Sequence, residues 1–197
     1  EIRKIFKASR IIGRRFKLVH IFNRSELIEV ATFRSGDDHD KEGNLVKDQS
    51  GKILRDNIWG TLEQDTFRRD FTINALYYCP TSGKIEDHNS GVKHIRDKKI
   101  VSIGDPSKRF SEDPVRSLRA IRFSNKLNFK IDSNIKDAIY KKGHLLSNIS
   151  NARIFDEFCK IFLSGLAEKN FRKLVSFGLN RYLIITNPNE NAFSCLL

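Results

Sequence analysis

The sequence has few cysteines, and their positions do not suit a disulfide scaffold or a zinc site. Cys79, Cys159 and Cys195 are odd in number and lie far apart, with no CxxC pattern. The five histidines show no HExxH or similar ligand spacing. Disulfide-stabilised secreted domains and zinc proteins are therefore disfavoured, and the cysteine usage fits a reducing compartment such as the cytoplasm.

Long apolar runs are also absent. No stretch approaches the roughly 20 apolar residues that a membrane helix needs, and no charged-then-apolar leader opens the chain. An aromatic-rich amphipathic helix with one basic face, typical of membrane-surface proteins, is missing as well. Because the chain starts at Glu1 inside a helix-like pattern, we expect it to be a piece of a longer protein.

Acidic residues are in the minority. The chain has 36 Lys and Arg against 24 Asp and Glu, which gives a formal net charge of +12. Such an excess causes self-repulsion, which an anionic partner relieves. A lysine-rich solvated surface is the alternative explanation. Because arginines recur at particular places and not only in lysine tracts, a nucleic acid is the favoured partner.

The hydrophobic pattern divides the chain into a mixed α/β part, residues 1–105, and an all-helical part, residues 106–197. The first part predicts short helices over 1–9 and near Leu62–Phe67, and strands at Lys17–Phe22, Leu27–Phe33, Phe71–Tyr78 and Lys84–Asp87. Both faces of the first of these strands are apolar, so we expect it to be covered on both sides. The second part predicts helices at Pro114–Phe123, Ser133–Lys142, Ala152–Leu163 and Lys169–Phe177.

One segment with possible chemistry is RRDFTINAL, residues 68–76. Arg68, Arg69 and Asp70 directly precede an expected buried strand. Arginine beside a carboxylate is often a surface pair of little energetic value. The same arrangement also serves as a phosphate clamp next to an acid that binds a metal or a ribose. Both interpretations remain open from these residues alone.

A second segment is SEDPVRSLRAIRF, residues 111–123. Asp113 suits a helix N-cap and Pro114 the first helical position. Arg116, Arg119 and Arg122 then form a row of neighbours near the positive end of the helix dipole, which costs roughly 0.3–1 kcal/mol per charge unless an anion binds there. Asp113 and Arg116 pair an acceptor with a donor fork, which can read a base edge. A capped helix with a basic outer face is the alternative.

Two further features are less specific. Glu29 lies among apolar residues of an expected strand, where a carboxylate is expensive unless it is paired or metal-bound. An ordinary polar face is the alternative. Asp87–Ile100 (DHNSGVKHIRDKKI) contains a strand end and a glycine turn, which suits a connector between domains.

Taken together, these segments resemble the bacterial poly(A) polymerase and tRNA nucleotidyltransferase (CCA-adding) family, within the polymerase-β-like superfamily. RRDFTINAL is similar to motif B of that family, DHNSGVKHIRD to motif C, EDPVRSLRAIRF to motif D, and NARIFDEFCKIFLSG to the helical neck. The segment IIGRRFKLVHI is closer to the poly(A) polymerase branch. The resemblance implies an α+β fold, in which a partial nucleotidyltransferase head with a mixed or antiparallel sheet is followed by an all-helical neck.

The resemblance also implies roles for single residues. Asp70 would be an active-site acid near the ribose, Arg69 would contact nucleotide phosphate or hold Asp70, and Asn74 would shape the pocket. Asp113 and Arg116 would read the adenine edge, and Arg119 would reach the triphosphate. Glu29 matches a third carboxylate beside the metal pair. The RNA-binding residues expected on the same basis are Arg14, Arg15 and Arg122.

The implied reaction is attack of an RNA 3′-hydroxyl on the α-phosphate of ATP, with two Mg²⁺ ions and release of pyrophosphate. The GGxVRD segment and the DxD carboxylates of the family lie upstream of the part matched by residues 1–9, so we expect this chain alone to be inactive. CCA addition is the alternative within the family. A non-catalytic RNA-binding module and a helical scaffold without a nucleotide role are the alternatives outside it.

Overall fold

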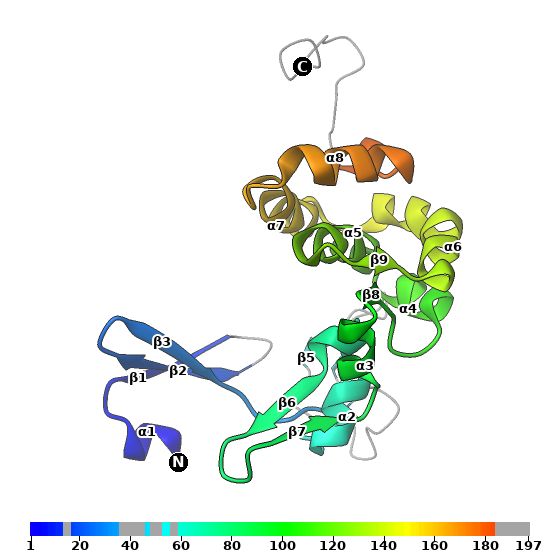
Figure 1. Ribbon diagram of the computed structural model, residues 1–197. Helices are drawn as coiled ribbons and strands as arrows, with labels where there is room; N and C mark the ends of the chain where they lie inside the picture. Colours follow the sequence, from blue (N-terminus) through cyan, green and yellow to red (C-terminus); the bar gives the residue numbers. More distant parts are fainter. Residues whose placement is uncertain (14–16, 36–45, 48–52, 56–58, 184–197) are drawn as a thin grey trace. The chain divides into compact units, whose positions relative to one another are not determined.

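The chain divides into two units, Glu1–Arg69 and Asp70–Leu197 (Figure 1). The computed structural model describes residues 1–13, 17–35, 46–47, 53–55 and 59–183. The division between head and neck expected at residues 105 and 106 therefore falls inside the second unit, and it stays a prediction.

The first unit contains a short helix and a three-stranded antiparallel sheet. Helix α1, Ile2–Ile5, is shorter than expected, because the chain extends into strand β1 at Ser9–Ile12. Strands β2, Leu18–Asn23, and β3, Glu26–Val30, correspond to the two predicted strands and form an antiparallel hairpin. Its turn places Arg24 at φ 54°, in the left-handed region. The strand order is β1-β2-β3.

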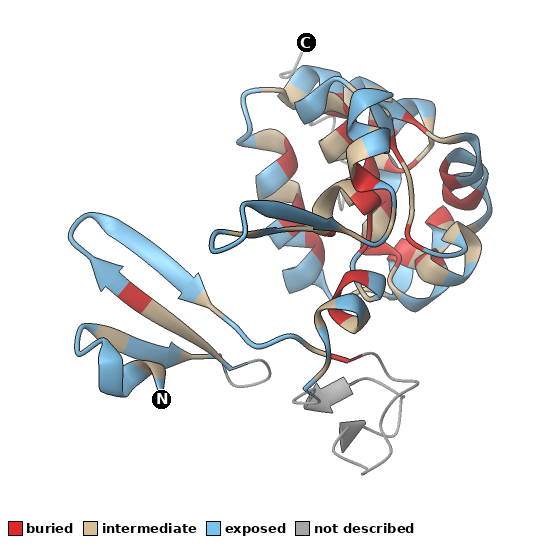
Figure 2. Ribbon diagram, turned by 60° about the horizontal axis from the view of Figure 1, so that its bottom comes forward, coloured by how far each residue is buried: buried red, intermediate tan, exposed pale blue. Residues whose placement is uncertain are grey.

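The expectation that β2 is covered on both sides is wrong. Ile21 is its single buried residue, and Phe22 is 51% exposed. Among the described elements of this unit, none forms a second layer over the sheet; Figure 2 shows its strands largely in the colour of exposed residues. Apolar side chains on both faces of a strand show that burial of both faces would be favourable. They do not show that other elements of the protein pack against those faces.

The rest of the first unit has little regular structure among its described residues. Strands β4, Val46–Lys47, and β5, Ile53–Arg55, pair with each other. Helix α2, Leu62–Phe67, confirms the predicted short helix. It begins with a capping box, in which Thr61 Oγ1 accepts from the Gln64 N–H at 3.2 Å and Gln64 Oε1 accepts from the Thr61 N–H at 2.9 Å.

The second unit opens with a turn where a strand was expected. Residues Thr72–Asn74 form the 3₁₀ turn η2, and the strand β6 begins only at Leu76 and ends at Cys79. The physical reason is Asp70, whose Oδ1 accepts from both the Phe71 N–H and the Asn74 amide and so bends the chain. Strand β7, Lys84–Asp87, confirms the predicted strand, and it pairs antiparallel with β6.

Helices make up most of the remainder. Helix α3, Gly91–Arg96, leads to strand β8, Lys99–Ile100, which pairs in parallel with β9, Lys130–Ile131. Between them lie α4, Pro106–Glu112, which the sequence pattern did not predict, and the expected α5, Val115–Leu127. The remaining elements are α6, Ser133–Lys142, η3, Gly143–Asn148, α7, Asn151–Phe162, α8, Ala167–Ser176, and η4, Asn180–Tyr182.

Helix α5 runs through the hydrophobic core of this unit. Its apolar face is fully buried, and α6, α7 and α8 each contact it (Figures 1 and 2). Most of the largest buried apolar side chains lie on β8 and on the helices that follow it, and the set comprises Phe71, Ile100, Phe110, Leu118, Ile121, Ile135, Ile139, Leu146, Ile161, Leu174 and Leu179. The predicted helical neck is confirmed, and α5 is its central element.

The start of α3 is fixed by one carboxylate. Asp87 Oδ1 accepts from the N–H groups of Asn89 and Gly91, and its Oδ2 accepts from that of Val92. Burial raises the pKa of Asp87, but these three backbone donors together outweigh it, so the pKa lies below the ordinary carboxyl value of 3.8. The segment expected as a connector is thus a tightly hydrogen-bonded corner.

Replacing Asp87 with Asn should lower the free energy of unfolding by about 1 kcal/mol at pH 7, because one strong acceptor for the helix start is lost. A lowered folded-state pKa stabilises above the unfolded-state value, and that stabilisation is lost as pH falls through the folded-state pKa. The difference between wild type and D87N should therefore shrink below pH 4 in urea titrations. A difference that stays constant down to pH 2 would contradict this account.

Gly91 leaves no room for a side chain. A Cβ added there would overlap the backbone oxygen of Thr72, and its φ lies outside the left-handed region, so space alone forbids the substitution. Gly91→Ala should lower the free energy of unfolding by about 1–3 kcal/mol in urea titrations. Gly83→Asn is the matched control, because a Cβ at Gly83 meets nothing within 4 Å and asparagine tolerates its φ of 67°.

Candidate functional site

Asp70 is the centre of the candidate site. It is 8% exposed, and its carboxylate accepts three hydrogen bonds. Oδ1 accepts from the Phe71 N–H at 2.8 Å and from Asn74 Nδ2 at 3.0 Å, and Oδ2 accepts from Arg119 Nε at 2.6 Å. A buried carboxylate needs such donors to remain charged. Three residues predicted for nucleotide chemistry, Asp70, Asn74 and Arg119, therefore lie together.

Arg119 reaches Asp70 from helix α5, 49 positions further along the chain. Its guanidinium carbon stands 5.3 Å from the ring centre of Phe123, and the Phe123 ring meets Phe71 edge-on at 6.1 Å. The ion pair and the aromatic contact thus join the same two segments. Together they fix the rotation of α5 about its axis next to Asp70.

Arg122 extends this arrangement to helix α7. Its Nε donates to Glu157 Oε1 at 2.6 Å, and its guanidinium carbon lies 4.3 Å from the ring centre of Phe123. Glu157 is almost fully buried, and Lys160 lies 3.6 Å from its other oxygen. The sequence analysis did not identify Glu157. Its position among the apolar residues of FDEFCKIF could have indicated a buried carboxylate that needs a partner.

Asp113 and Arg116 lie at the start of α5. Asp113 Oδ1 accepts from the Val115 N–H at 3.2 Å, and its Oδ2 accepts from Arg153 Nη2 at 2.6 Å. Arg116 Nη1 donates to the Arg109 carbonyl at 2.8 Å and lies 3.3 Å from Glu112 Oε2. The expectation that Asp113 is the N-cap and Pro114 the first helical residue is wrong by one position, because α5 begins at Val115 and Pro114 is its N-cap. Asp113 instead accepts from the first helical N–H, and Arg153 is a partner that sequence spacing did not reveal.

The environment of Arg116 is partly desolvated. Burial lowers the pKa of Arg116 below its usual value, and the neighbouring Arg109 lowers it further, against the opposing effect of Asp113 and Glu112. The guanidinium is therefore held in place next to a second cation and close to the Asp113 carboxylate. Such a site presents a fixed donor fork and an acceptor at one helix end.

Within the first unit, Arg68 and Arg69 both donate to Asp65. Arg68 Nη1 lies 3.1 Å from Asp65 Oδ1, and Arg69 binds Oδ2 through Nε and Nη2 at 3.2 and 3.0 Å. Asp65 is buried and accepts from the Arg34 N–H as well. Arg119 donates to Asp70, and the role expected for Arg69, contact with nucleotide phosphate or with Asp70, stays a prediction. Asp65, three and four positions before the arginines, was the missed signal.

Glu29 belongs to strand β3, where its Oε1 lies 3.0 Å from His20 Nε2 on the neighbouring strand β2. Its side chain is largely exposed. Cross-strand pairing with His20 accounts for a carboxylate among apolar strand residues. Its match to a metal-bound acid stays a prediction, and Arg14 and Arg15 lie outside the described residues.

The described residues do not form a magnesium site. They contain no group of three or more acidic, histidine or cysteine side chains placed to hold a metal ion. The Asp70 carboxylate accepts three protein hydrogen bonds, and Glu29 contacts His20 through Oε1 alone, so neither carboxylate by itself supplies the set of oxygens that Mg²⁺ requires. Also, no helix in the described part of the chain is long and apolar enough to cross a membrane.

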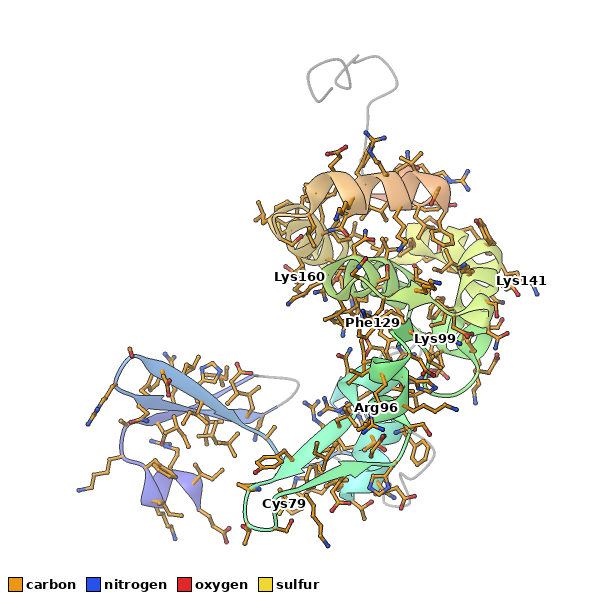
Figure 3. All side chains as sticks on the ribbon, viewed as in Figure 1. Cys79, Arg96, Lys99, Phe129, Lys141 and Lys160 are labelled. Atoms are coloured by element: carbon orange, nitrogen blue, oxygen red, sulfur yellow. The ribbon has the colours of Figure 1, made fainter. Side chains whose placement is uncertain are left out.

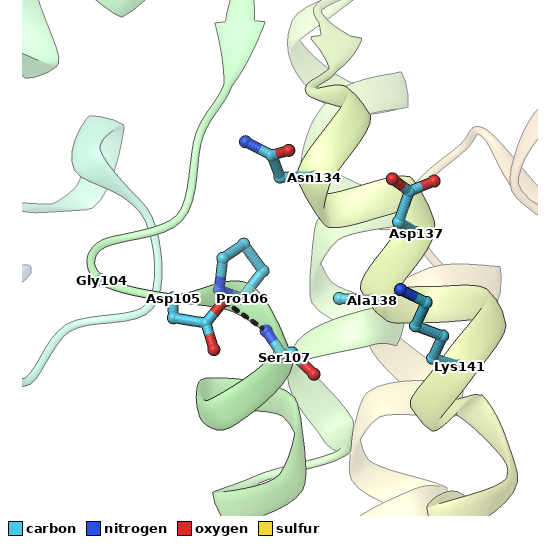
Figure 4. Close-up of a pocket in the computed structure, with 8 residues that line it drawn as sticks. All are labelled: Gly104, Asp105, Pro106, Ser107, Asn134, Asp137, Ala138 and Lys141. Carbon is cyan, nitrogen blue, oxygen red and sulfur yellow. Dashed lines mark hydrogen bonds between the residues drawn. The ribbon is translucent and has the colours of Figure 1, made fainter.

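A shallow polar pocket lies at a different place in the second unit, between the start of α4 and one face of α6 (Figure 4). Asp105 caps α4 there by accepting from the N–H groups of Ser107 and Lys108 at 3.3 and 2.9 Å. Asp137 and Lys141 line its other wall. The Asp105 oxygens are used in the helix cap. The pocket lining includes neither Asp70 nor Arg119, so we treat the pocket as separate from the candidate site.

Comparison with known proteins gives the fold and the family. The crystal structure of the Bacillus stearothermophilus CCA-adding enzyme in complex with CTP is similar to 92% of this chain and 42% of that chain, with 31% identity and a TM-score of 0.72. The chain therefore shares the fold of this enzyme, a polymerase-β-like head followed by a helical neck, over the part that the two have in common.

More particularly, the chain belongs to the poly(A) polymerase family. The model for the poly A polymerase head domain matches residues 1–101, and that for the probable RNA and SrmB-binding site of polymerase A matches residues 128–188. Poly(A) polymerase I of Haemophilus influenzae is 44% identical over 91% of this chain. The CCA-adding enzyme of Anoxybacillus flavithermus is 35% identical over 93%. The chain spans 40% and 44% of the lengths of these two relatives.

Breaking the Asp70–Arg119 pair should destabilise the second unit. In Arg119→Gln, the buried carboxylate loses its charged donor, and we expect the free energy of unfolding to fall by about 3 kcal/mol in urea titrations followed by circular dichroism. The control is Arg172→Gln, which breaks an exposed pair with Glu168 and should cost less than about 0.5 kcal/mol. Equal losses in the two variants would contradict a special role for Arg119.

Proposed function

We propose that this chain is the nucleotide-selecting and RNA-binding part of an enzyme that adds AMP from ATP to RNA 3′ ends without a template. The observation that carries the proposal is the cluster around α5. It unites Asp70, Asn74 and Arg119 on one side, and places Asp113 and Arg116 at the helix start. The name of the relative from Haemophilus influenzae supports polyadenylation.

In this proposal each residue keeps the geometry described above. Asp113 accepts from the amino group of adenine, and Arg116 donates to a ring nitrogen, because an acceptor beside a donor fork matches that edge. Arg119, held by Asp70 through Nε, presents its terminal nitrogens to the triphosphate. Asp70 and Asn74 orient Arg119, so that the phosphates meet a fixed cation and not a mobile one.

The chemical step is attack of the RNA 3′-oxygen on the α-phosphorus of ATP, with loss of pyrophosphate. Mg²⁺, when bound by the complete enzyme, would activate the hydroxyl and stabilise the leaving group. Its ligands would have to include carboxylates other than Asp70, whose oxygens are occupied here. We therefore assign to the described residues nucleotide selection and RNA binding, and we place the protein in the cytoplasm, where the free thiols of Cys79 and Cys159 stay reduced.

CCA addition is the second candidate. It is favoured by the similarity to the CCA-adding enzyme from Bacillus stearothermophilus, whose structure contains CTP. An acceptor and a donor fork at the start of α5 could serve cytosine as well as adenine, since both bases present an amino group next to a ring nitrogen. A third candidate, an RNA-binding module without nucleotide selection, would keep the basic neck alone.

The test is nucleotide selectivity of the chain, measured by competition with a fluorescent ATP analogue. Wild type should prefer ATP over GTP, and Arg116→Ala should reduce this preference by about tenfold, the equivalent of one hydrogen bond from a charged group. Glu112 keeps Arg109 as a partner in this variant, and circular dichroism checks that the loss of the Arg116 bond to the Arg109 carbonyl leaves the fold intact. Arg172→Ala, which removes an exposed cation from α8, should leave selectivity unchanged.

Selectivity that survives Arg116→Ala would contradict the base-reading role and favour the module without nucleotide selection. To separate the two enzymatic candidates, the full-length protein with Mg²⁺ should be given tRNA lacking its CCA end. Incorporation of CTP onto this primer would overturn polyadenylation in favour of CCA addition. Incorporation of ATP alone, onto any RNA 3′ end, would support polyadenylation.

A further inference from the structure

A lysine on helix α8 is bound to neutral partners only. Lys173 Nζ donates to Ser124 Oγ at 2.8 Å and to Asn125 Oδ1 at 3.2 Å, both on α5. Among the described residues, no carboxylate lies within ion-pair distance of Lys173. An ammonium group has three hydrogens to donate, so two are used here and one remains for a further acceptor.

The groups that hold Lys173 are themselves fixed. Asn125 Nδ2 donates to Asn170 Oδ1 at 2.9 Å, and the Asn170 amide donates in turn to the Ile161 carbonyl at 2.8 Å. Ser124 Oγ donates to the Ile121 carbonyl at 2.8 Å. Ser124 and Asn170 are both 1% exposed. Hydrogen bonds among the helices α5, α7 and α8 thus fix the position of the partly buried Lys173 ammonium group.

A second lysine, Lys136 on α6, acts electrostatically on Lys173. Burial lowers the pKa of Lys173, and repulsion by Lys136 on α6 lowers it further. Like Lys173, Lys136 forms no ion pair among the described residues, whereas cations nearby on α7 and α8 do: Arg153 pairs with Asp113, Lys160 with Glu157 and Arg172 with Glu168. Two lysines without an ion pair, on helix segments whose Tyr140 and Phe177 rings are in contact, leave a positive potential that an anion would relieve.

Aromatic rings adjoin this pair of lysines. Tyr140 follows Lys136 by four positions on α6, and Phe177 follows Lys173 by four positions at the end of α8, so each ring lies one helical turn from a lysine. The two rings are in contact, with centroids 5.2 Å apart. Tyr140 is nevertheless 64% exposed and offers a ring face to a partner. Further along α6, the side chain of Lys141 extends outward (Figure 3).

Cations beside an exposed aromatic ring are the combination that binds single-stranded nucleic acid, since ammonium groups hold phosphates and rings stack on bases. We propose that Lys136, Lys173 and Tyr140 form a subsite on the helical neck for one nucleotide of the single-stranded RNA substrate. The inference rests on the proposed function. It adds to it a defined surface within residues 128–188, which match the RNA- and SrmB-binding model.

The test is binding of a fluorescent oligoadenylate to the chain, measured by anisotropy at several salt concentrations. Lys136→Gln and Lys173→Gln should each weaken binding about 3- to 10-fold and reduce the slope of log affinity against log salt by about 0.7, as expected for one lost phosphate contact to a single strand. Arg172→Gln is the matched control, because it removes the same charge from α8 at a cation paired with Glu168, and it should change affinity less than about 2-fold.

The aromatic part is tested at one position. Tyr140→Leu should weaken oligoadenylate binding by about 5-fold or more, whereas Tyr140→Phe, which keeps the ring, should bind as wild type does. Equal affinities of Tyr140→Leu and wild type would overturn the stacking role. An equal loss in Arg172→Gln and Lys173→Gln would overturn the phosphate subsite in favour of general charge, and equally strong competition by polyglutamate would indicate an acidic protein partner instead.

The outcome is separable from that of the proposed function. Preference for ATP over GTP, measured on Lys136→Gln and Tyr140→Leu, should equal that of wild type, because neither residue lies at the start of α5. If these variants bind RNA as wild type does while ATP selectivity holds, the subsite is wrong and the proposed function stands. If wild type binds no oligoadenylate, both fall. Lys136 and Tyr140 are exposed, so their variants report on binding even if Lys173→Gln perturbs packing.

Discussion

The ion pair between Asp70 and Arg119 is the interaction on which the candidate site depends. The carboxylate is buried and would be costly without its donors, and Arg119 is the charged one among them. Because the pair joins the first residue of the second unit to the middle of α5, it sets how that helix is rotated. The direction in which Arg116 points, one turn earlier on α5, follows from that rotation.

Features governed by local sequence were predicted well. The β2–β3 hairpin, the β6–β7 pair and the helices α5 to α8 follow from residue periodicity and from caps, which act over a few positions. The predicted strand start at Phe71 was wrong, because hydrogen bonds to the Asp70 side chain replace strand pairing there and form the turn η2. The missing layers over β2 depend on which elements pack together, and periodicity carries no such information.

The acids that pair with Arg116, Arg119 and Arg122 could not be predicted from the sequence, for a different reason. Spacing placed Arg116, Arg119 and Arg122 near the positive end of a helix and predicted an anion, but it could not say which one. In the structure, each arginine is paired with an acid of the protein, and two of these acids lie 35 and 49 positions away. Each arginine of the row therefore already has an acidic partner within the protein. The positive charges without an ion pair that we describe on α6 and α8 are those of Lys136 and Lys173.

The way Arg119, Arg122 and Arg153 cross between elements limits how this protein can change over evolutionary time. Each is matched to one acid on a separate segment, namely Asp70, Glu157 and Asp113. In the Arg119 and Arg122 pairs, whose acids are buried, a reversal of charge at one end alone would bring two like charges into contact in a partly dehydrated interface, whereas the Arg153 pair is more exposed. Replacement at the four positions of the buried pairs is therefore expected to be coupled, so that each acid and its arginine behave as a single inherited character.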